Sequence, residues 1–264
     1  MGVKTKIKTA ARVLNTFGPF ELARLAVRKL GHTKTGTGEV SRPRGVEVKT
    51  AAELTDDFYS LVLKASLEEI ALARSQYVSY QSGFKERVTS PRTSFFNPIF
   101  DLGLGMSEFV FLCILVKKPL MVIETGVAAG VSTNAMLSAL QINGAGNLLS
   151  LDITQKVGEL VDDNLKTRWK LEILPELARE NSFAKYLKEN NGATIFLHDS
   201  DHSGAWQIKE FNNVVRHLPG IELILFDDIS QDLIDFTTSN HADYRIIVID
   251  ENRKYSAIIL KSRI

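Results

Sequence analysis

The sequence predicts an α/β fold in which a doubly wound, mostly parallel sheet of seven strands ends in an antiparallel hairpin. From residue 105 onward, short β-rich runs alternate with helical stretches, which is the pattern of a parallel sheet covered by helices on both faces. The last two strands are separated only by the polar turn ENRK, and a turn this tight joins antiparallel neighbours. A chain of 264 residues is long enough for one such domain with an N-terminal helical extension.

Three zones follow one another along the chain. Residues 1–50 are predicted to form a basic leader of two short helices and a loop, and residues 51–104 to form a helix followed by a candidate active-site lid. The lid would be the aromatic-rich loop from Tyr77 to Asn97, although a structural surface loop explains the same residues equally well. Residues 105–264 are predicted to form the ligand-binding sheet domain.

Each predicted strand of this domain can be read from a short apolar run. The strands are expected at 120–126, 147–153, 169–174, 193–199, 221–228, 244–250 and 255–261. Helices are expected at 106–116, 132–141, 177–189, 205–218 and 231–237. Ligands of doubly wound sheets bind outside the carboxyl ends of the strands, so the residues that end each strand are the candidate site residues.

A glycine-rich turn, VIETGVAAGVS, joins the first strand of the domain to its helix. Gly126 and Gly130 have no Cβ, so the backbone there can turn sharply and approach a ligand closely. Ser132 or Thr133 is expected to cap the helix. The N-terminus of that helix presents N–H groups and the positive end of its dipole, which suit a carboxylate.

Two acidic residues complete the candidate cofactor site. Glu124 ends the first strand and suits a ligand with an amine and a sulfonium, whereas Ala128 departs from the G-x-G-x-x-G pattern that admits a pyrophosphate. Asp152 ends the second strand, from which an acid can bind ribose hydroxyls. Together with the hairpin, the segment resembles motif I (E/D-x-G-x-x-x-G) of class I S-adenosylmethionine-dependent methyltransferases. The resemblance implies their Rossmann-like fold and S-adenosylmethionine bound by Glu124, Gly126, Gly130, Ser132 and Asp152.

Two later strands also end in acidic residues, in FLHDSDHS and LFDDIS. Neighbouring strands lie about 4.8 Å apart, so we expect Asp199 to lie close to Asp227 and Asp228. Three converging carboxylates repel one another unless a cation lies between them, and their oxygen atoms favour Mg²⁺, with Mn²⁺ or Ca²⁺ as alternatives. Acids that cap helices or lie in water would give the same pattern.

The same acidic motifs resemble those of metal-dependent sugar O-methyltransferases and of the cephalosporin hydroxylase-like (rhamnosyl O-methyltransferase) group, over about residues 105–230. The residues that the resemblance assigns are the Mg²⁺ ligands Asp199, Asp227 and Asp228 and a general base, Asp201 or His202. It implies methylation of a hydroxyl group of a sugar or similar small molecule, with the metal lowering the pKa of that hydroxyl and the base accepting its proton. The chain departs from the common form at Gly204, where an aromatic residue is usual. His198 is expected to be structural, on the other face of the strand.

Two other functions fit the same residues. A metal-free class I methyltransferase would use the acids for hydrogen bonding to another small molecule, and a non-catalytic binding protein would keep only the fold. RNA methylation is disfavoured by charge. Residues 1–50 carry eleven basic and three acidic residues, a balance of +8, which leaves −7 for the remainder of a chain whose net charge is +1.

The cellular location and the partners of the protein are predicted from its N-terminal residues, its apolar runs and its cysteine content. It has no recognisable signal peptide and no apolar run of about 20 residues, so a cytoplasmic location is expected. The basic leader is expected to pack on the domain or on a second copy in a homodimer, with peripheral membrane contact as the alternative. The single cysteine, Cys113, excludes an internal disulfide and is expected to be buried.

Overall fold

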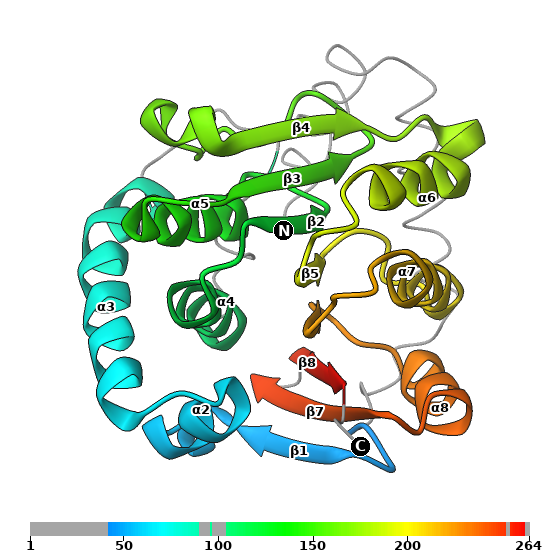
Figure 1. Ribbon diagram of the computed structural model, residues 1–264, viewed down its shortest axis with the longest axis horizontal. Helices are drawn as coiled ribbons and strands as arrows, with labels where there is room; N and C mark the ends of the chain where they lie inside the picture. Colours follow the sequence, from blue (N-terminus) through cyan, green and yellow to red (C-terminus); the bar gives the residue numbers. More distant parts are fainter. Residues whose placement is uncertain (1–41, 90–95, 97–103, 252–253, 262–264) are drawn as a thin grey trace, which may run out of the picture. The chain divides into compact units, whose positions relative to one another are not determined.

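One mixed sheet of eight strands runs through the part of the chain that the computed structural model describes, residues 42–89, 96, 104–251 and 254–261 (Figure 1). The order across the sheet is β1-β7-β8-β6-β5-β2-β3-β4. The strands are β1 (Glu47–Thr50), β2 (Met121–Thr125), β3 (Asn147–Asp152), β4 (Trp169–Ile173), β5 (Ile195–His198), β6 (Leu223–Phe226), β7 (Tyr244–Glu251) and β8 (Lys254–Lys261). Only β8 runs antiparallel to its neighbours, so the predicted doubly wound sheet with an antiparallel hairpin is confirmed.

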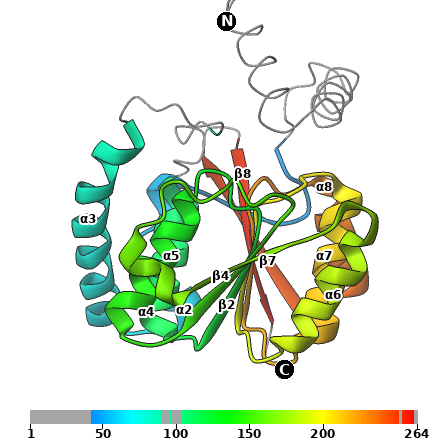
Figure 2. The ribbon, with the colours of Figure 1, turned by 90° about the horizontal axis from the view of Figure 1, so that it is seen from above.

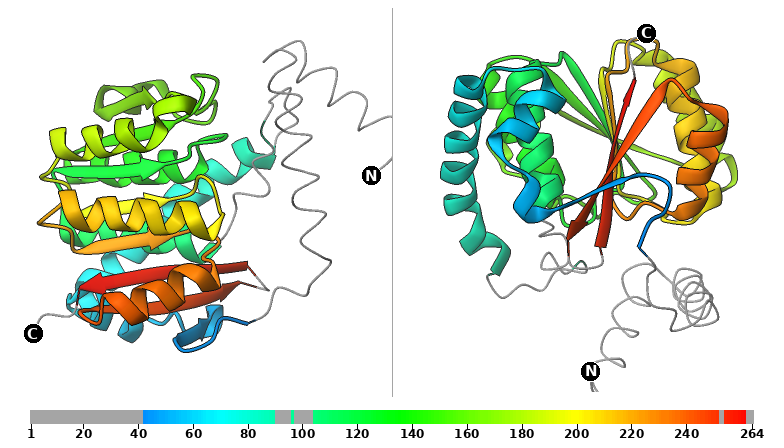
Figure 3. Two further views of the ribbon diagram at one scale, coloured as in Figure 1. Left: turned by 90° about the vertical axis from the view of Figure 1, so that its right-hand side faces the viewer. Right: turned by 90° about the horizontal axis from the view of Figure 1, so that it is seen from below.

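Helices cover both faces of this sheet, as Figure 2 shows: α3, α4 and α5 lie on one face, and α6, α7 and α8 on the other. The last three lie side by side along their face (Figure 3). The helices are α2 (Asp56–Leu63), α3 (Leu67–Thr89), α4 (Leu104–Lys117), α5 (Val131–Asn143), α6 (Arg179–Glu189), α7 (Gly204–His217) and α8 (Gln231–Asn240). The apolar helix α4 is almost entirely buried and contains Cys113, whose pKa is raised by its burial.

The sheet has one strand more than the seven predicted. Strand β1 adds to its edge in parallel with β7, so that Glu47 lies opposite Ile247. Its four residues follow a sequence rich in glycine and proline, and a run this short gives a weak alternation signal. The chain divides into two units, Met1–Arg42 and Pro43–Ile264, and β1 belongs to the second. The two predicted leader helices lie outside the described residues, and the proposed dimer and membrane contacts of the leader stay predictions.

The predicted lid is wrong over its first half, because α3 continues to Thr89. The single helix expected before the lid, within residues 51–77, is two helices, since Lys64 adopts a left-handed φ of 52° and ends α2. Beyond that break, Tyr77, Phe84 and Val88 are seven and four residues apart, which places them on one face of a helix. All three side chains are buried. Residues 90–95 and 97–103 lie outside the described part of the chain. No helix in the described part is long and apolar enough to cross a membrane.

Candidate active site

The glycine-rich turn lies at the carboxyl end of β2, and two of its glycines are required by their surroundings. Gly126 has a φ of +82°, and a Cβ there would lie 1.9 Å from the carbonyl oxygen of Asp199. Gly130 has a φ of +90°, and a Cβ there would lie 2.9 Å from the Cα of Gly158. L-residues with side chains rarely adopt such angles. The turn therefore packs closely against Asp199, which follows β5, and against Gly158, which follows β3.

The N-terminus of α5 is not capped by a side chain, which corrects the prediction for Ser132 and Thr133. Gly130 is the N-cap residue, and it makes no side-chain hydrogen bond to the helix. The Thr133 hydroxyl instead donates to Oε1 of Glu124 at 2.8 Å. Ser132 is half-buried in the first turn of the helix, next to the glycine-rich turn.

The Glu124 carboxyl group is fully buried, and it points to the face of the sheet that α5 covers. Its Oε1 accepts hydrogen bonds from the hydroxyls of Thr133 and Ser150, while Trp169 Nε1 donates to Ser150 Oγ at 2.7 Å. Its Oε2 is buried without a hydrogen-bond partner in the described structure. Burial raises the pKa of Glu124 to about 8, against the opposing effect of the two hydroxyl donors. Glu124 is therefore mostly protonated at neutral pH.

Asp152 ends β3 and contacts the glycine-rich turn directly. Its Oδ2 accepts the backbone N–H of Val127 at 2.9 Å, and its Oδ1 accepts those of Ile153 at 2.7 Å and Thr154 at 3.1 Å. Burial raises its pKa, and the three N–H donors partly offset the rise. The Gly126 N–H also donates to the Leu151 carbonyl oxygen at 2.9 Å. The expected meeting of Asp152 with the turn at the ends of β2 and β3 is thus present.

The acidic ends of β5 and β6 also lie side by side, as the topology required. The Asp199 N–H donates to the Thr125 carbonyl oxygen at 2.7 Å, and the Asp227 N–H donates to the His198 carbonyl oxygen at 2.9 Å. Asp228 adopts a left-handed φ of 56°, and its pKa is raised by burial and by the charge of Asp227. These acidic residues therefore lie at one edge of the sheet, next to the turn.

The cation beside these carboxylates belongs to the protein. Lys254, the first residue of β8, places its Nζ 2.6 Å from Oδ2 of Asp227, and Ser256 Oγ donates to Oδ1 at 3.0 Å. Both oxygens of the predicted ligand Asp227 are thus engaged by donors. The described residues contain no group of three or more His, Cys, Asp or Glu side chains placed to hold a metal ion. The predicted Mg²⁺ set of Asp199, Asp227 and Asp228 does not fit a divalent metal in this arrangement.

Glu210 of α7 is the centre of a buried network that the sequence did not reveal. Its Oε2 lies 2.8 Å from the Thr125 hydroxyl and 2.7 Å from Nδ1 of His198, and Glu210 and His198 are both fully buried. Its Oε1 accepts from the Ser200 hydroxyl at 3.0 Å and from Trp206 Nε1. Burial alone would raise the pKa of Glu210, but His198 and the other donors hold it below the ordinary value.

The two candidate bases lie on the loop that this network anchors. Asp201 Oδ1 accepts the Ser203 N–H at 3.1 Å, and its Oδ2 lies 3.5 Å from Nη1 of Arg179. The Arg179 guanidinium in turn stacks on the Trp206 ring at 3.8 Å. The His202 ring lies edge-to-face against His198 with centroids 5.9 Å apart. His198 therefore faces α7, as expected for the other face of the strand, but it supports the site instead of only filling the core.

A family comparison finds a similarity over the middle of the chain. Residues 123–229, from within β2 to just beyond β6, match the family model of a methyltransferase domain. Over these residues the chain is similar to methyltransferase domains. The predicted enzyme class, an S-adenosylmethionine-dependent methyltransferase, is confirmed, and the glycine-rich turn and both acidic motifs lie within the matched residues. None of the curated proteins matches the chain in sequence.

Several solved methyltransferases are similar to the chain at low sequence identity. TomG, an O-methyltransferase of Streptomyces achromogenes involved in tomaymycin synthesis and solved with S-adenosylmethionine, is 12% identical; the match covers 70% of this chain and 96% of that one, with a TM-score of 0.49. A Geobacter sulfurreducens methyltransferase is 14% identical over 72% and 97% of the two chains, with a TM-score of 0.47. A Podospora anserina methyltransferase bound to S-adenosylhomocysteine is 13% identical over 83% and 100%, with a TM-score of 0.45. Likenesses this distant assign neither an acceptor nor a metal to this methyltransferase.

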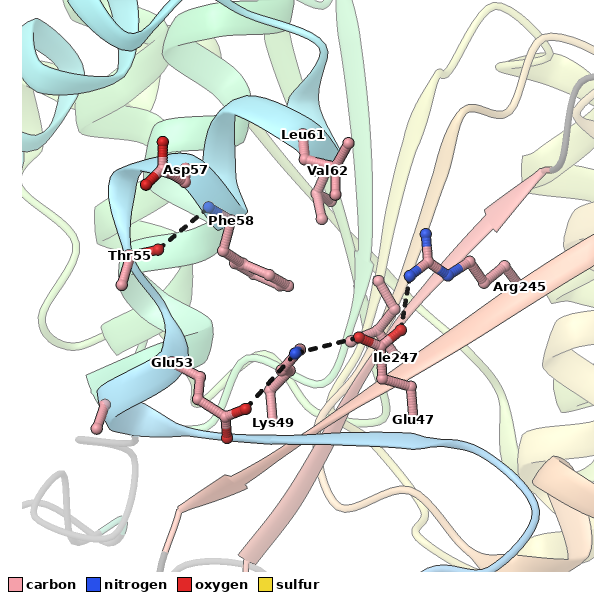
Figure 4. A pocket seen from close by; sticks show the side chains of 11 residues that line it. Glu47, Lys49, Glu53, Thr55, Asp57, Phe58, Leu61, Val62, Arg245 and Ile247 are labelled. Atoms are coloured by element: carbon pink, nitrogen blue, oxygen red, sulfur yellow. Dashed lines mark hydrogen bonds and ion pairs between the residues drawn. The ribbon is translucent and has the colours of Figure 1, made fainter.

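A separate pocket of about 430 Å³ lies between β1, α2 and the beginning of β7 (Figure 4). Lys49 lies 3.3 Å from Glu47 and 3.5 Å from Glu53, and Arg245 binds Glu47 at 2.6 Å. Apolar side chains, among them Phe58, form the rest of its lining. The two basic residues of this pocket pair with Glu47 and Glu53, and none of the methyltransferase site residues lines it.

Proposed function

We propose that this methyltransferase transfers the methyl group of S-adenosylmethionine to a hydroxyl oxygen of a small molecule, and that a glycoside is the first acceptor class to test. The observation that carries the proposal is the contact of Gly126 with Asp199. It joins the glycine-rich turn, the candidate cofactor site, to the loop that holds the candidate bases. A methyl donor and an acceptor must meet in this way, because transfer requires the two reacting atoms to be in near-attack contact.

The residues around the turn fit S-adenosylmethionine. Each oxygen of Asp152 has two lone pairs, so its bonds to backbone N–H groups leave acceptor capacity for ribose hydroxyls. Glu124 Oε2 is the buried acceptor left for an amine, and the first turn of α5, with Ser132, would bind a carboxylate. When bound, the cofactor supplies an electrophilic methyl group on a sulfonium.

On the acceptor side, His202 is the proposed general base. The alternative, Asp201, is less available to a substrate proton, because its Oδ2 lies 3.5 Å from the Arg179 guanidinium and its Oδ1 accepts the Ser203 N–H. His202 packs against His198, which Glu210 holds through Nδ1. A positioned imidazole that accepts the hydroxyl proton contributes about 10²–10⁴-fold to the rate.

Mg²⁺ assistance, which the acidic motifs implied, is not part of the proposal, because Lys254 and Ser256 engage both oxygens of Asp227. In the metal-free alternative, Asp199, Asp227 and Asp228 do not bind a metal ion. They would orient the acceptor by hydrogen bonds, and the transfer of the hydroxyl proton to His202 requires no metal.

Calorimetry with S-adenosylmethionine tests the cofactor half of the proposal. The wild-type protein should bind the cofactor, and Asp152→Ala should bind it at least tenfold more weakly, which corresponds to about 1.4 kcal/mol. Asp163→Ala, which changes an exposed carboxylate paired with Lys166, is the matched control and should bind as wild type does. A wild-type protein that binds no S-adenosylmethionine would contradict the proposed function.

Methyl transfer is tested with radiolabelled S-adenosylmethionine and a panel of glycosides, phenols and aliphatic alcohols. Label should appear on oxygen in at least one class, and His202→Ala should transfer it about 10²–10⁴-fold more slowly. Transfer to nitrogen or carbon acceptors alone would overturn the assignment to hydroxyl groups.

A further inference from the structure

The first observation concerns residues 158–162, which follow β3 and lie against the glycine-rich turn. The Gly158 N–H donates to the Ala128 carbonyl oxygen at 2.9 Å, and the Leu160 N–H donates to the Ala129 carbonyl oxygen at the same distance. Ala128 has a left-handed φ of 47°, which a residue with a side chain keeps only where its surroundings hold it. Residues 158–162 therefore help to hold the turn in its conformation.

The second observation is that α3 binds this segment through the side chain of Arg87. Its Nη2 donates to the Leu160 carbonyl oxygen at 2.8 Å, and its Nη1 pairs with Oδ1 of Asp162. The guanidinium also lies over the ring of Phe84, 5.3 Å from its centroid. Asn134 of α5, which is fully buried, donates to the same Leu160 oxygen at 2.9 Å. The segment is thus bound to both α3 and α5.

A small buried cluster joins the same parts of the molecule. Its side chains come from the end of α3, from the turn and the beginning of α5, and from the segment that Arg87 binds: Phe84, Val88, Ala129, Val131 and Leu160. Closely packed side chains transmit a displacement, because they leave little free space around one another. The position of the last turns of α3 is therefore linked to the conformation of the glycine-rich turn.

We propose that Arg87 is a positioning residue of the cofactor site, and that it couples α3 to the binding of S-adenosylmethionine by holding residues 158–162 against the glycine-rich turn. The inference rests on the proposed function, in which the cofactor binds at this turn. A contact that favours the binding conformation of the turn raises the affinity for the cofactor. By linkage, the bound cofactor favours the contact by the same factor.

Calorimetry with S-adenosylmethionine tests the inference, with a second arginine of α3 as the matched control. Arg87→Met should bind the cofactor at least about fivefold more weakly than wild type. Arg74 also binds a carboxylate, a backbone carbonyl oxygen and an aromatic ring, and its side chain is 31% exposed against 36% for Arg87. These groups belong to Glu108, Leu54 and Tyr59 instead of to residues 158–162. Arg74→Met should therefore lose stability but bind the cofactor as wild type does.

The ion pair of Arg87 with Asp162 supplies a second, independent variant. Asp162→Asn removes the charged partner of Arg87 and should also weaken cofactor binding. The double variant should bind no more than about twofold more weakly than Arg87→Met, because both substitutions remove the same contact. Arg87→Lys keeps the cation and should bind more tightly than Arg87→Met. If Arg87→Met fails to fold, Asp162→Asn takes its place, since the Asp162 side chain is 41% exposed.

Two results would overturn the inference and leave the proposed function intact. The first is a wild-type protein that binds S-adenosylmethionine together with a folded Arg87→Met protein that binds it equally well. The second is an Arg74→Met protein whose affinity falls as far as that of Arg87→Met, because the effect would then come from a general loosening of α3. A wild-type protein that binds no S-adenosylmethionine would instead contradict the proposed function, and this inference with it.

Discussion

Two fully buried glutamates lie on opposite faces of β2, and their surroundings give them opposite charge states. Glu124 points to α5 and accepts hydrogen bonds from the hydroxyls of Thr133 and Ser150, and its pKa is raised to about 8 by burial. Glu210 reaches the other face from α7 and is held by the Thr125 hydroxyl and the His198 imidazole, and its pKa stays below the ordinary value. Burial alone therefore does not decide the charge of a carboxyl group. The donors around it do.

The difference divides the site into two parts. On the cofactor side, Glu124 can gain or lose a proton near neutral pH. On the acceptor side, Glu210 is a fixed anion that ties together β2, β5 and α7. The largest effect is therefore expected from neutralising Glu210.

Glu210→Gln should lower the free energy of unfolding by about 3–5 kcal/mol, the usual cost of breaking a buried charged pair by changing one partner. A glutamine must also direct its amide NH₂ toward groups that already donate to Glu210, such as Trp206 Nε1. Urea denaturation at pH 7 measures the change. Glu180→Gln, which removes a half-exposed pair with Lys209, is the control and should cost less than about 1 kcal/mol. A loss below 1 kcal/mol in Glu210→Gln would refute the charged network.

The cofactor side could be predicted from sequence because its geometry is local. Glu124, Gly126 and Gly130 belong to one strand, turn and helix, so their spacing fixes their relative positions. Asp152 follows from the rule that neighbouring parallel strands end at the same edge. Only the cap was misplaced, since the Thr133 hydroxyl turns inward to Glu124.

The acceptor side could not be predicted in the same way. Lys254 comes from the antiparallel strand β8, and which of its residues lies beside Asp227 depends on a register that the sequence does not state. Glu210 lies on a helix, where an acidic residue ordinarily indicates an exposed face.

The length of α3 could have been predicted from the sequence, because its buried aromatic residues continue at helical spacing beyond Tyr77.

The two glutamates also differ in how they make the stability of the protein depend on pH, and the effect of Glu124 follows from its raised pKa. The folded pKa of Glu124, about 8, lies above its ordinary value of 4.5, so the folded state holds a proton that the unfolded chain has released. Between these two values, the free energy of unfolding should fall as pH rises, by up to about 1.4 kcal/mol per unit, and level off above pH 8. Glu124→Gln lacks this contribution.

Urea denaturation of both proteins at pH 5.5, 6.5, 7.5 and 8.5 isolates the contribution of Glu124, because the titrations of other groups largely cancel in the difference. The stability of Glu124→Gln relative to wild type should rise with pH up to about 8. At pH 5.5 the substitution should cost less than about 1 kcal/mol, since the amide oxygen can accept the same hydroxyl bonds. A difference that does not change with pH would show that Glu124 is already ionised in the folded protein.

The smallest expected effect links this titration to the cofactor. If Glu124 Oε2 receives the amine of S-adenosylmethionine, the cationic ligand favours the carboxylate and lowers its pKa, so binding at pH 7 should release up to about one proton per site. Calorimetry in phosphate and in Tris measures the release, because the two buffers take up protons with different heats. Glu210→Gln should keep the release and Glu124→Gln should lose it, since only Glu124 holds a proton to give. Equal heats in both buffers would show that Glu124 does not bind the cofactor amine and that its role is structural.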